Sequence, residues 1–96
     1  MSMMVLVIYD ISDDRDRLRL SELLKDFGLD RIQYSGFKGE LHRHDVEVLA
    51  KRVKRYVKGL RDSVYIIPLC NRCVHLCRII STKETKLVDD SVVKVV

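Results

Sequence analysis

The sequence predicts an α+β fold, a ferredoxin-like β-α-β-β-α-β sandwich with an antiparallel sheet and an added C-terminal strand. Short β-branched runs alternate with amphipathic stretches in that order, and 96 residues leave room for one domain only. With 47% hydrophobic and 33% charged residues, the chain is typical of a globular protein. A chain this short leaves much apolar surface in water, so we also expect a homodimer.

The first half of the pattern begins with an unbroken apolar run from Met3 to Tyr9, which predicts a central strand buried on both faces. Ser12 is expected to cap the helix that follows, because three aspartates then lie at the positive end of the helix dipole. Gly28 is suited to the end of this helix. The alternating stretch from Leu29 to Leu41 predicts two short strands or one long bent strand.

The second half is expected to hold a helix from His44 to Lys58 and a strand from Asp62 to Leu69. A further short strand is predicted from His75 to Ile80, and Ser91 to Val96 could form a last strand, on this subunit or on another. We therefore place the ferredoxin-like domain at residues 1–80 and a tail or strand, open to exchange between subunits, at residues 81–96.

The charge is unevenly distributed along the chain. Residues 1–50 carry seven basic and ten acidic side chains, whereas residues 51–96 carry eleven basic and four acidic ones. Six basic residues without an acid among them form what we call the basic cluster: Lys51, Arg52, Lys54, Arg55, Lys58 and Arg61. Such a cluster suits a polyanion, with Arg52, Arg55 and Lys58 as candidate nucleic-acid contacts. A solvated helix face would look the same.

No membrane span is expected, because the longest apolar run is far shorter than the ~20 residues that a span needs. No export signal is expected either, because no basic residue precedes that run and Asp10 closes it. Cys70, Cys73 and Cys77 are odd in number and lie in one short stretch, which argues against a disulfide framework and favours a cytoplasmic location. A zinc site is disfavoured because no second ligand pair follows. We expect these cysteines to be small buried hydrophobic residues.

Asp10 directly follows the first strand and precedes a helix, so its carboxylate lies at a strand end. A carboxylate there could hold Mg²⁺, which prefers oxygen ligands. One carboxylate is a poor metal site, but a two-fold axis that brought two copies of Asp10 together would supply a pair. The structural alternative is that Asp10 caps a turn.

Three further residues could contact a nucleic acid. Arg17 lies about one turn into the first helix, where it could bind a scissile phosphate bidentately or pair within the helix. Arg31 alternates with an apolar residue on the second strand and could face a phosphate backbone. Phe37 could stack on a base, although a core or dimer-interface position is commoner, and we favour the interface.

Residues 3–80 resemble a known family at Val5-Leu-Val-Ile-Tyr-Asp-Ile11, at Asp30-Arg-Ile-Gln-Tyr-Ser-Gly-Phe37 and at Asp62-Ser-Val-Tyr-Ile-Ile-Pro-Leu69. The chain is similar to the small CRISPR-associated "Cas-two" proteins, the dimeric partners of the integrase in spacer acquisition. The resemblance implies a homodimer with a terminal strand that crosses to the partner, and Mg²⁺- or Mn²⁺-dependent cleavage of RNA or double-stranded DNA. It assigns the metal and catalytic position to Asp10, and positions around the cleft to Tyr9, Arg17, Arg19, Arg31 and Phe37.

Two residues depart from the family pattern: Gly36 replaces a β-branched residue, and Lys38 stands where an acid is common. Both could alter the strand or its substrate contacts, while Asp10 is retained. The favoured function is a metal-dependent endonuclease of spacer acquisition, with Asp10, Arg17 and Arg31 as catalytic residues. The alternatives are a non-catalytic DNA-binding dimer that scaffolds the integrase and a toxin-type ribonuclease of related fold.

Overall fold

A computed structural model describes residues 2–81 and the backbone of residues 93–95. The elements of the N-terminal part are β1 (Ser2–Asp10), α1 (Asp14–Asp26), β2 (Asp30–Gln33), β3 (Gly36–His42), α2 (Arg43–Val53), the 3₁₀ turn η1 (Lys54–Tyr56) and β4 (Ser63–Leu69). They are followed by α3 (Asn71–Leu76), β5 (Ile79–Ser81) and β6 (Val93–Val95).

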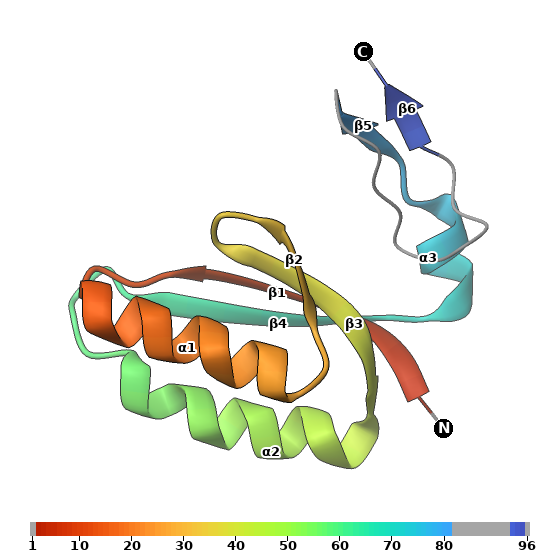
Figure 1. The fold of residues 1–96 in the computed structure, drawn as a ribbon. Helices are drawn as coiled ribbons and strands as arrows, with labels where there is room; N and C mark the ends of the chain where they lie inside the picture. The colour runs from red at the N-terminus through yellow and green to blue at the C-terminus, as the bar shows by residue number, and fades with distance from the viewer. Residues whose placement is uncertain (1, 82–92, 96) are drawn as a thin grey trace.

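The first four strands form one antiparallel sheet in the order β2-β3-β1-β4, with α1 and α2 on one face (Figure 1). This is the predicted ferredoxin-like arrangement. Side chains alternate between the faces of a strand, so Val5, Val7 and Tyr9 of β1 point together into the core beneath the helices. β1 is not buried on both faces as predicted: Ile8, on the other face, is 49% exposed. The two helices cover only one side, which leaves an open sheet face.

The N-cap of α1 is Asp13 rather than the predicted Ser12. Its carboxylate accepts a hydrogen bond from the Asp16 amide at 2.8 Å, while Ser12 bonds to Asp62. Gly28 follows the helix with a φ of +87°, a conformation that favours glycine. The start of α1 is therefore one residue later than predicted, and its end is where the glycine indicated.

Residues 29–41 form the first predicted alternative, two short strands. The bulge lies in β2, where the register with β3 shifts between Arg31 and Gln33. Gly39 is required by a close approach, because a Cβ there would lie 2.6 Å from Leu29 Cδ2. α2 ends at Val53 and passes into η1, so the helix is shorter than predicted.

The predicted strand from His75 to Ile80 is wrong, because α3 still includes His75 and Leu76 and β5 begins only at Ile79. The expectation that the cysteines are buried is also wrong: Cys70 and Cys73 are exposed, and Cys77 is half-buried. The six residues of α3 bury only Val74. The helix is thus too short and too exposed for the thiols to serve as core.

The last strand, β6, pairs in parallel with β5 of the same chain. Figure 1 shows this pair beyond α3, away from the helices that cover the main sheet. The predicted boundary between domain and tail falls within β5, and residues 82–92 and 96 lie outside the described part. Exchange of the tail between subunits stays a prediction. None of the described helices is both long and apolar enough to cross a membrane.

Candidate functional site at the end of β1

Asp10 is the last residue of β1 and pairs with Ser63 at the beginning of β4. It is exposed, and by strand alternation its side chain lies on the open face of the sheet, opposite to that of Tyr9. In the described part of the chain no side-chain hydrogen bond or ion pair involves Asp10. Capping is performed by Asp13 and Asp62 instead, so the structure does not support a capping role for Asp10.

A hollow of about 220 Å³ lies on the other face, where α1 meets β2. It is lined by Tyr9, Asp14, Arg17, Leu18, Ser21, Arg31 and Tyr34. The structure thus brings together three of the predicted site residues, Tyr9, Arg17 and Arg31. In a single chain it does not place Asp10 in the same hollow.

Arg17 ties this hollow to the end of β1. Its Nη1 donates to the Ile11 carbonyl oxygen at 3.0 Å, directly after Asp10, and its Nη2 forms an ion pair with Asp14. The guanidinium carbon also lies 5.8 Å from the centre of the Tyr34 ring. The first-turn pairing considered from sequence is therefore present, and it holds Arg17 at the same end of the sheet as Asp10.

Arg31 reaches the hollow from β2. Its Nη1 donates to the Tyr34 carbonyl oxygen at 2.5 Å, and its guanidinium carbon stands 4.9 Å from the centre of the Phe37 ring. Tyr9 lies below, 3% exposed, with its hydroxyl donating to the Tyr34 carbonyl oxygen at 3.5 Å. Burial raises the pKa of Tyr9, while nearby Arg31 acts in the opposite direction. The phenol therefore stays protonated at neutral pH.

Phe37 is fully buried in the core, so it is neither available for base stacking nor placed at an interface as predicted. Its ring stacks at 6.3 Å from that of Tyr9 and supports Arg31 from beneath. Sequence reasoning missed Tyr34, which is 71% exposed at the turn between β2 and β3. An aromatic residue in a turn, three positions after Arg31, is the signal that could have identified it.

Arg19 lies on a different side of α1 from Arg17, because residues two positions apart in an α-helix do not share a face. It lines a separate polar hollow together with Lys58 and Asp62. Within the basic cluster, Arg52 lies over the Phe27 ring and Arg55 over the Tyr56 ring, each at 5.7 Å. Both guanidinium groups are exposed but braced by an aromatic neighbour.

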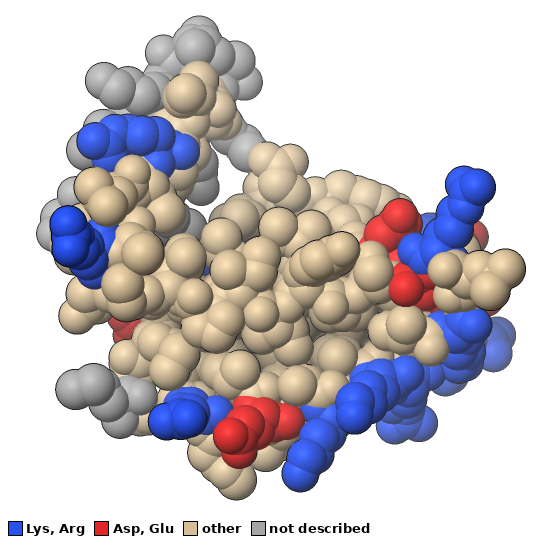
Figure 2. All heavy atoms as spheres, turned by 180° about the vertical axis from the view of Figure 1, so that it is seen from behind, with Lys and Arg blue, Asp and Glu red and all other residues tan. Residues whose placement is uncertain are grey.

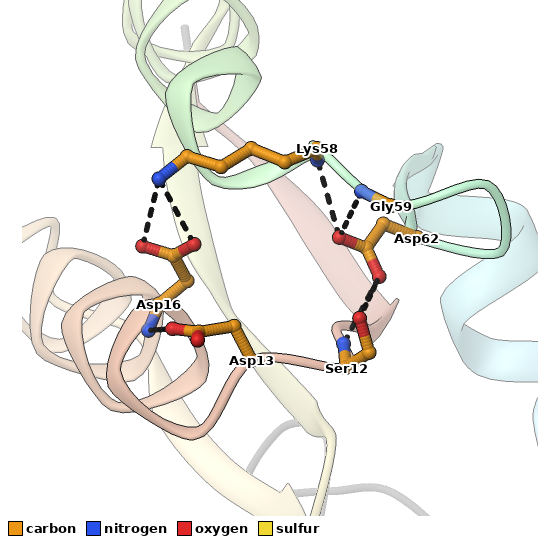
Figure 3. Close-up of polar contacts among 6 residues, drawn as sticks. All are labelled: Ser12, Asp13, Asp16, Lys58, Gly59 and Asp62. Atoms are coloured by element: carbon orange, nitrogen blue, oxygen red, sulfur yellow. Dashed lines mark hydrogen bonds and ion pairs between the residues drawn. The ribbon is translucent and has the colours of Figure 1, made fainter.

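Lys58 is not a free cation. Its Nζ lies 3.1 Å from Oδ2 of Asp16, a carboxylate that is almost fully buried (Figure 3). Asp62, on the same loop, accepts bonds from the amides of Lys58, Gly59 and Ser12 and from the Ser12 hydroxyl, at 2.8–3.1 Å. The amide of Gly59, followed by those of Ser12 and Lys58, holds the pKa of Asp62 far below its usual range. The loop before β4 is thereby fastened to the loop after β1.

The residues of one chain alone do not make a metal site: the described part contains no group of three or more His, Cys, Asp or Glu side chains placed to hold an ion. The exposed carboxylate of Asp10 nevertheless fits one ligand position of Mg²⁺, which is often bound by one or two carboxylates and several waters. A second copy of Asp10 would complete such a pair.

Comparisons with known proteins agree with this architecture. The family model for CRISPR associated protein Cas2 matches residues 3–75. A CRISPR-associated endoribonuclease Cas2 from Archaeoglobus fulgidus is 50% identical over 98% of this chain and 100% of its own length. The solved structure of a hypothetical protein from Thermus thermophilus is similar with a TM-score of 0.67 and 34% identity, covering 74% of this chain and 85% of that one.

A third similar protein contains a related segment within a longer chain. The chain is 35% identical, over 75% of its length, to a fusion of CRISPR-associated endonuclease Cas1 and endonuclease Cas2 from Thermoproteus tenax, of which it covers 27%. The family match spans the strand that ends in Asp10, the hollow with Arg17 and Arg31, and the whole antiparallel sheet. This chain belongs to the CRISPR associated protein Cas2 family.

Proposed function

We propose that this chain is a metal-dependent endoribonuclease of CRISPR spacer acquisition, acting as a homodimer with Asp10 of each subunit in one shared site. The names of its relatives describe endoribonucleases, which favours this function over a toxin-type ribonuclease or a non-catalytic scaffold. The observation that carries the proposal is that the Asp10 side chain is exposed at a strand end and makes no hydrogen bond or ion pair within the described residues.

Cleavage of a phosphodiester requires that the phosphate is bound and that the negative charge of the transition state is stabilised. Arg17 and Arg31 suit the phosphate, because a guanidinium binds two phosphate oxygens in a fixed geometry and stabilises the negative charge that develops on them. Both are positioned by carbonyl oxygens of the chain, those of Ile11 and Tyr34. Mg²⁺ or Mn²⁺ held by the two carboxylates would supply Lewis-acid chemistry and activate the attacking water.

The open face of the sheet supports the homodimer. Figure 2 shows that the side of the molecule away from the helices has a broad area without charged side chains, bordered along one edge by Lys and Arg. Ile8, Tyr65 and Ile67, on neighbouring strands of that face, are 49%, 61% and 37% exposed. Contiguous apolar surface of this kind marks an interaction site. Asp10 lies on the same face, so a two-fold contact there would bring two copies towards one another.

The experiment is cleavage of single-stranded RNA and duplex DNA over a titration of Mg²⁺ and Mn²⁺. We expect the wild-type chain to cut RNA in proportion to bound metal, and Asp10→Asn to lose cutting by about 10²-fold or more while staying folded and dimeric. Asp26→Asn, an equal charge change on an exposed residue at the far end of α1, should cut as wild type does. Equal rates for Asp10→Asn and wild type would contradict the proposal.

The partner in this proposal is the separate Cas1 protein. The Thermoproteus tenax relative holds both units in one chain, and this supports an association between them when they are separate. The basic cluster, with Arg52 and Arg55 exposed, would then bind the nucleic acid that the two proteins share. Co-purification of the two proteins, with and without duplex DNA, checks this part.

A further inference from the structure

Three cysteines gather on α3, beyond the region of the candidate nuclease site. Cys70 is the N-cap residue, Cys73 is the third residue of the helix, and Cys77 is the C-cap. All three are free thiols, and the first two are exposed. None of them has a role in the proposed nuclease chemistry.

The capping geometry brings Cys70 and Cys73 together. Cys70 has an extended backbone, with φ −72° and ψ 164°, and its Sγ accepts a hydrogen bond from the Cys73 amide at 3.5 Å. Cys77 is engaged differently, because its Sγ donates to the Cys73 carbonyl oxygen at 3.3 Å. The Cys70 sulfur is therefore held at the amide of Cys73, whereas the Cys77 sulfur is bonded to a carbonyl oxygen of the helix.

The same contacts make the two thiols unequal. The Cys73 amide, followed by the Cys73 thiol, lowers the pKa of Cys70, and donation to the Cys70 sulfur raises the pKa of Cys73. The thiolate is the reactive form in thiol–disulfide exchange, and a C-x-x-C pair at the start of a helix is a common setting for it. Cys70 is thus suited to attack first, and Cys73 to resolve the intermediate.

We propose that Cys70 and Cys73 form a reversible disulfide, so that the first turn of α3 is a thiol–disulfide switch. The Cys70 thiolate attacks a low-molecular-weight disulfide such as oxidised glutathione, giving a mixed disulfide and one glutathione thiolate. Cys73 gives up its proton and attacks the Cys70 sulfur, which closes the Cys70–Cys73 bond and releases the second glutathione. Two cysteine thiols are oxidised, one glutathione disulfide is reduced, and the two protons go to the released glutathione thiolates.

The disulfide would stiffen the connection between β4 and β5. Residues three apart in a helix have Cβ atoms about 5–6 Å apart, whereas a disulfide brings them to about 3.5–4.5 Å, so the first turn tightens. The Val74 amide, which donates to the Cys70 carbonyl oxygen at 3.0 Å, closes the same turn. The switch therefore acts on the segment that leads from the main sheet to β5.

The experiment incubates the full chain with glutathione buffers of increasing oxidised fraction, followed by thiol labelling, trypsin digestion and mass spectrometry. Trypsin cuts after Arg72, so Cys70 and Cys73 fall in separate peptides, whereas Cys73 and Cys77 remain in one. We expect oxidation to protect two thiols and to join the peptide ending at Arg72 to the peptide that begins at Cys73. The matched variant Cys77→Ser should form the same link.

One further variant and a measurement of hydrogen exchange at one backbone amide complete the test. Cys73→Ser should accumulate the glutathione mixed disulfide at Cys70, and oxidation of the wild type should slow hydrogen exchange at the Val74 amide. A link that disappears in Cys77→Ser, stable mixed disulfides on the wild type, or bonds only between chains would each overturn the proposal. Because the readout is covalent mass and amide exchange, the result does not depend on nuclease activity.

Discussion

At the scale of residues, Asp10 and Asp62 are carboxylates at the same end of the sheet with opposite roles. The Asp62 carboxylate accepts four hydrogen bonds, two within its own loop and two from Ser12 that join it to the loop after β1. The side chain of Asp10, which pairs across the strands with Ser63, accepts none in the described structure. A carboxylate that accepts several backbone N–H bonds strongly favours its charged form. Asp62 therefore stabilises the fold, whereas the exposed carboxylate of Asp10 makes no contact that would conflict with the metal-binding role proposed for it.

The lowered pKa of Asp62 predicts an acid-sensitive contribution to stability. The folded-state pKa lies below the unfolded one, so the contribution is complete above the unfolded pKa and is lost as pH falls towards the folded pKa. We expect the urea midpoint of wild type to fall between about pH 5 and pH 2 more steeply than that of Asp62→Asn. Parallel curves for the two proteins would contradict this assignment.

The burial of Phe37 could not be predicted from the residue type and its place on a strand. Its aromatic character and strand position were evident, but the face on which it lies depends on the register between β1 and β3. Val7 pairs with Phe37 in that register, which directs Phe37 towards the helices. A shift of one residue would reverse the face. Pairing registers are set by contacts far apart in sequence, so the burial of Phe37 could not be predicted from its neighbours.

At the scale of elements, the sequence predicted the helices and strands whose apolar pattern extends over many residues. β1, α1 and β4 are present within one or two residues of their predicted bounds. The prediction of a strand from His75 to Ile80 failed because the stretch is short. The start of α3 depends on a sulfur at the N-cap, which apolar periodicity does not show. α2 is shorter than predicted because Lys54–Tyr56 form a 3₁₀ turn, which a hydrophobic pattern does not distinguish from a further turn of α-helix.

The contact between α1 and that loop predicts a specific loss of stability. Lys58→Met would leave the Asp16 carboxylate, 8% exposed, without its cation, so we expect a loss of about 1–3 kcal/mol in the free energy of unfolding. Lys51→Met removes an exposed charge of the same kind and should change stability by less than about 0.5 kcal/mol. Equal losses for the two variants, measured by urea unfolding, would show that the ion pair is not stabilising.

At the scale of the whole molecule, charge and apolar surface are separated. The formal net charge is +4, and the basic cluster lies along α2, η1 and the loop that follows. The open sheet face has a broad uncharged area in Figure 2 and exposes the large apolar side chains of Ile8, Tyr65 and Ile67. This separation fits a protein that contacts a second copy through its sheet and a polyanion along its basic side. Composition predicted the charge asymmetry, but only the fold shows which face is left free.

The basic cluster predicts how nucleic-acid binding depends on salt. Each lost phosphate contact reduces the slope of log affinity against log salt, so Arg52→Gln with Arg55→Gln should lower its magnitude by about 1–2. The matched pair Lys25→Gln with Arg72→Gln removes the same charge from α1 and α3 and should leave the slope close to wild type. Equal slopes for the two double variants would exclude the cluster as the binding surface.

Mixed dimers distinguish one nuclease site shared by two copies of Asp10 from two independent sites. Wild type and Asp10→Asn are unfolded together, refolded at varied ratios, and assayed for RNA cleavage at constant total protein. If a site needs both carboxylates, only wild-type dimers cut, and an equal mixture retains about one quarter of the wild-type rate. A rate that falls in proportion to the wild-type fraction, to about half in the equal mixture, would show that each subunit acts alone and would contradict a shared Asp10 site.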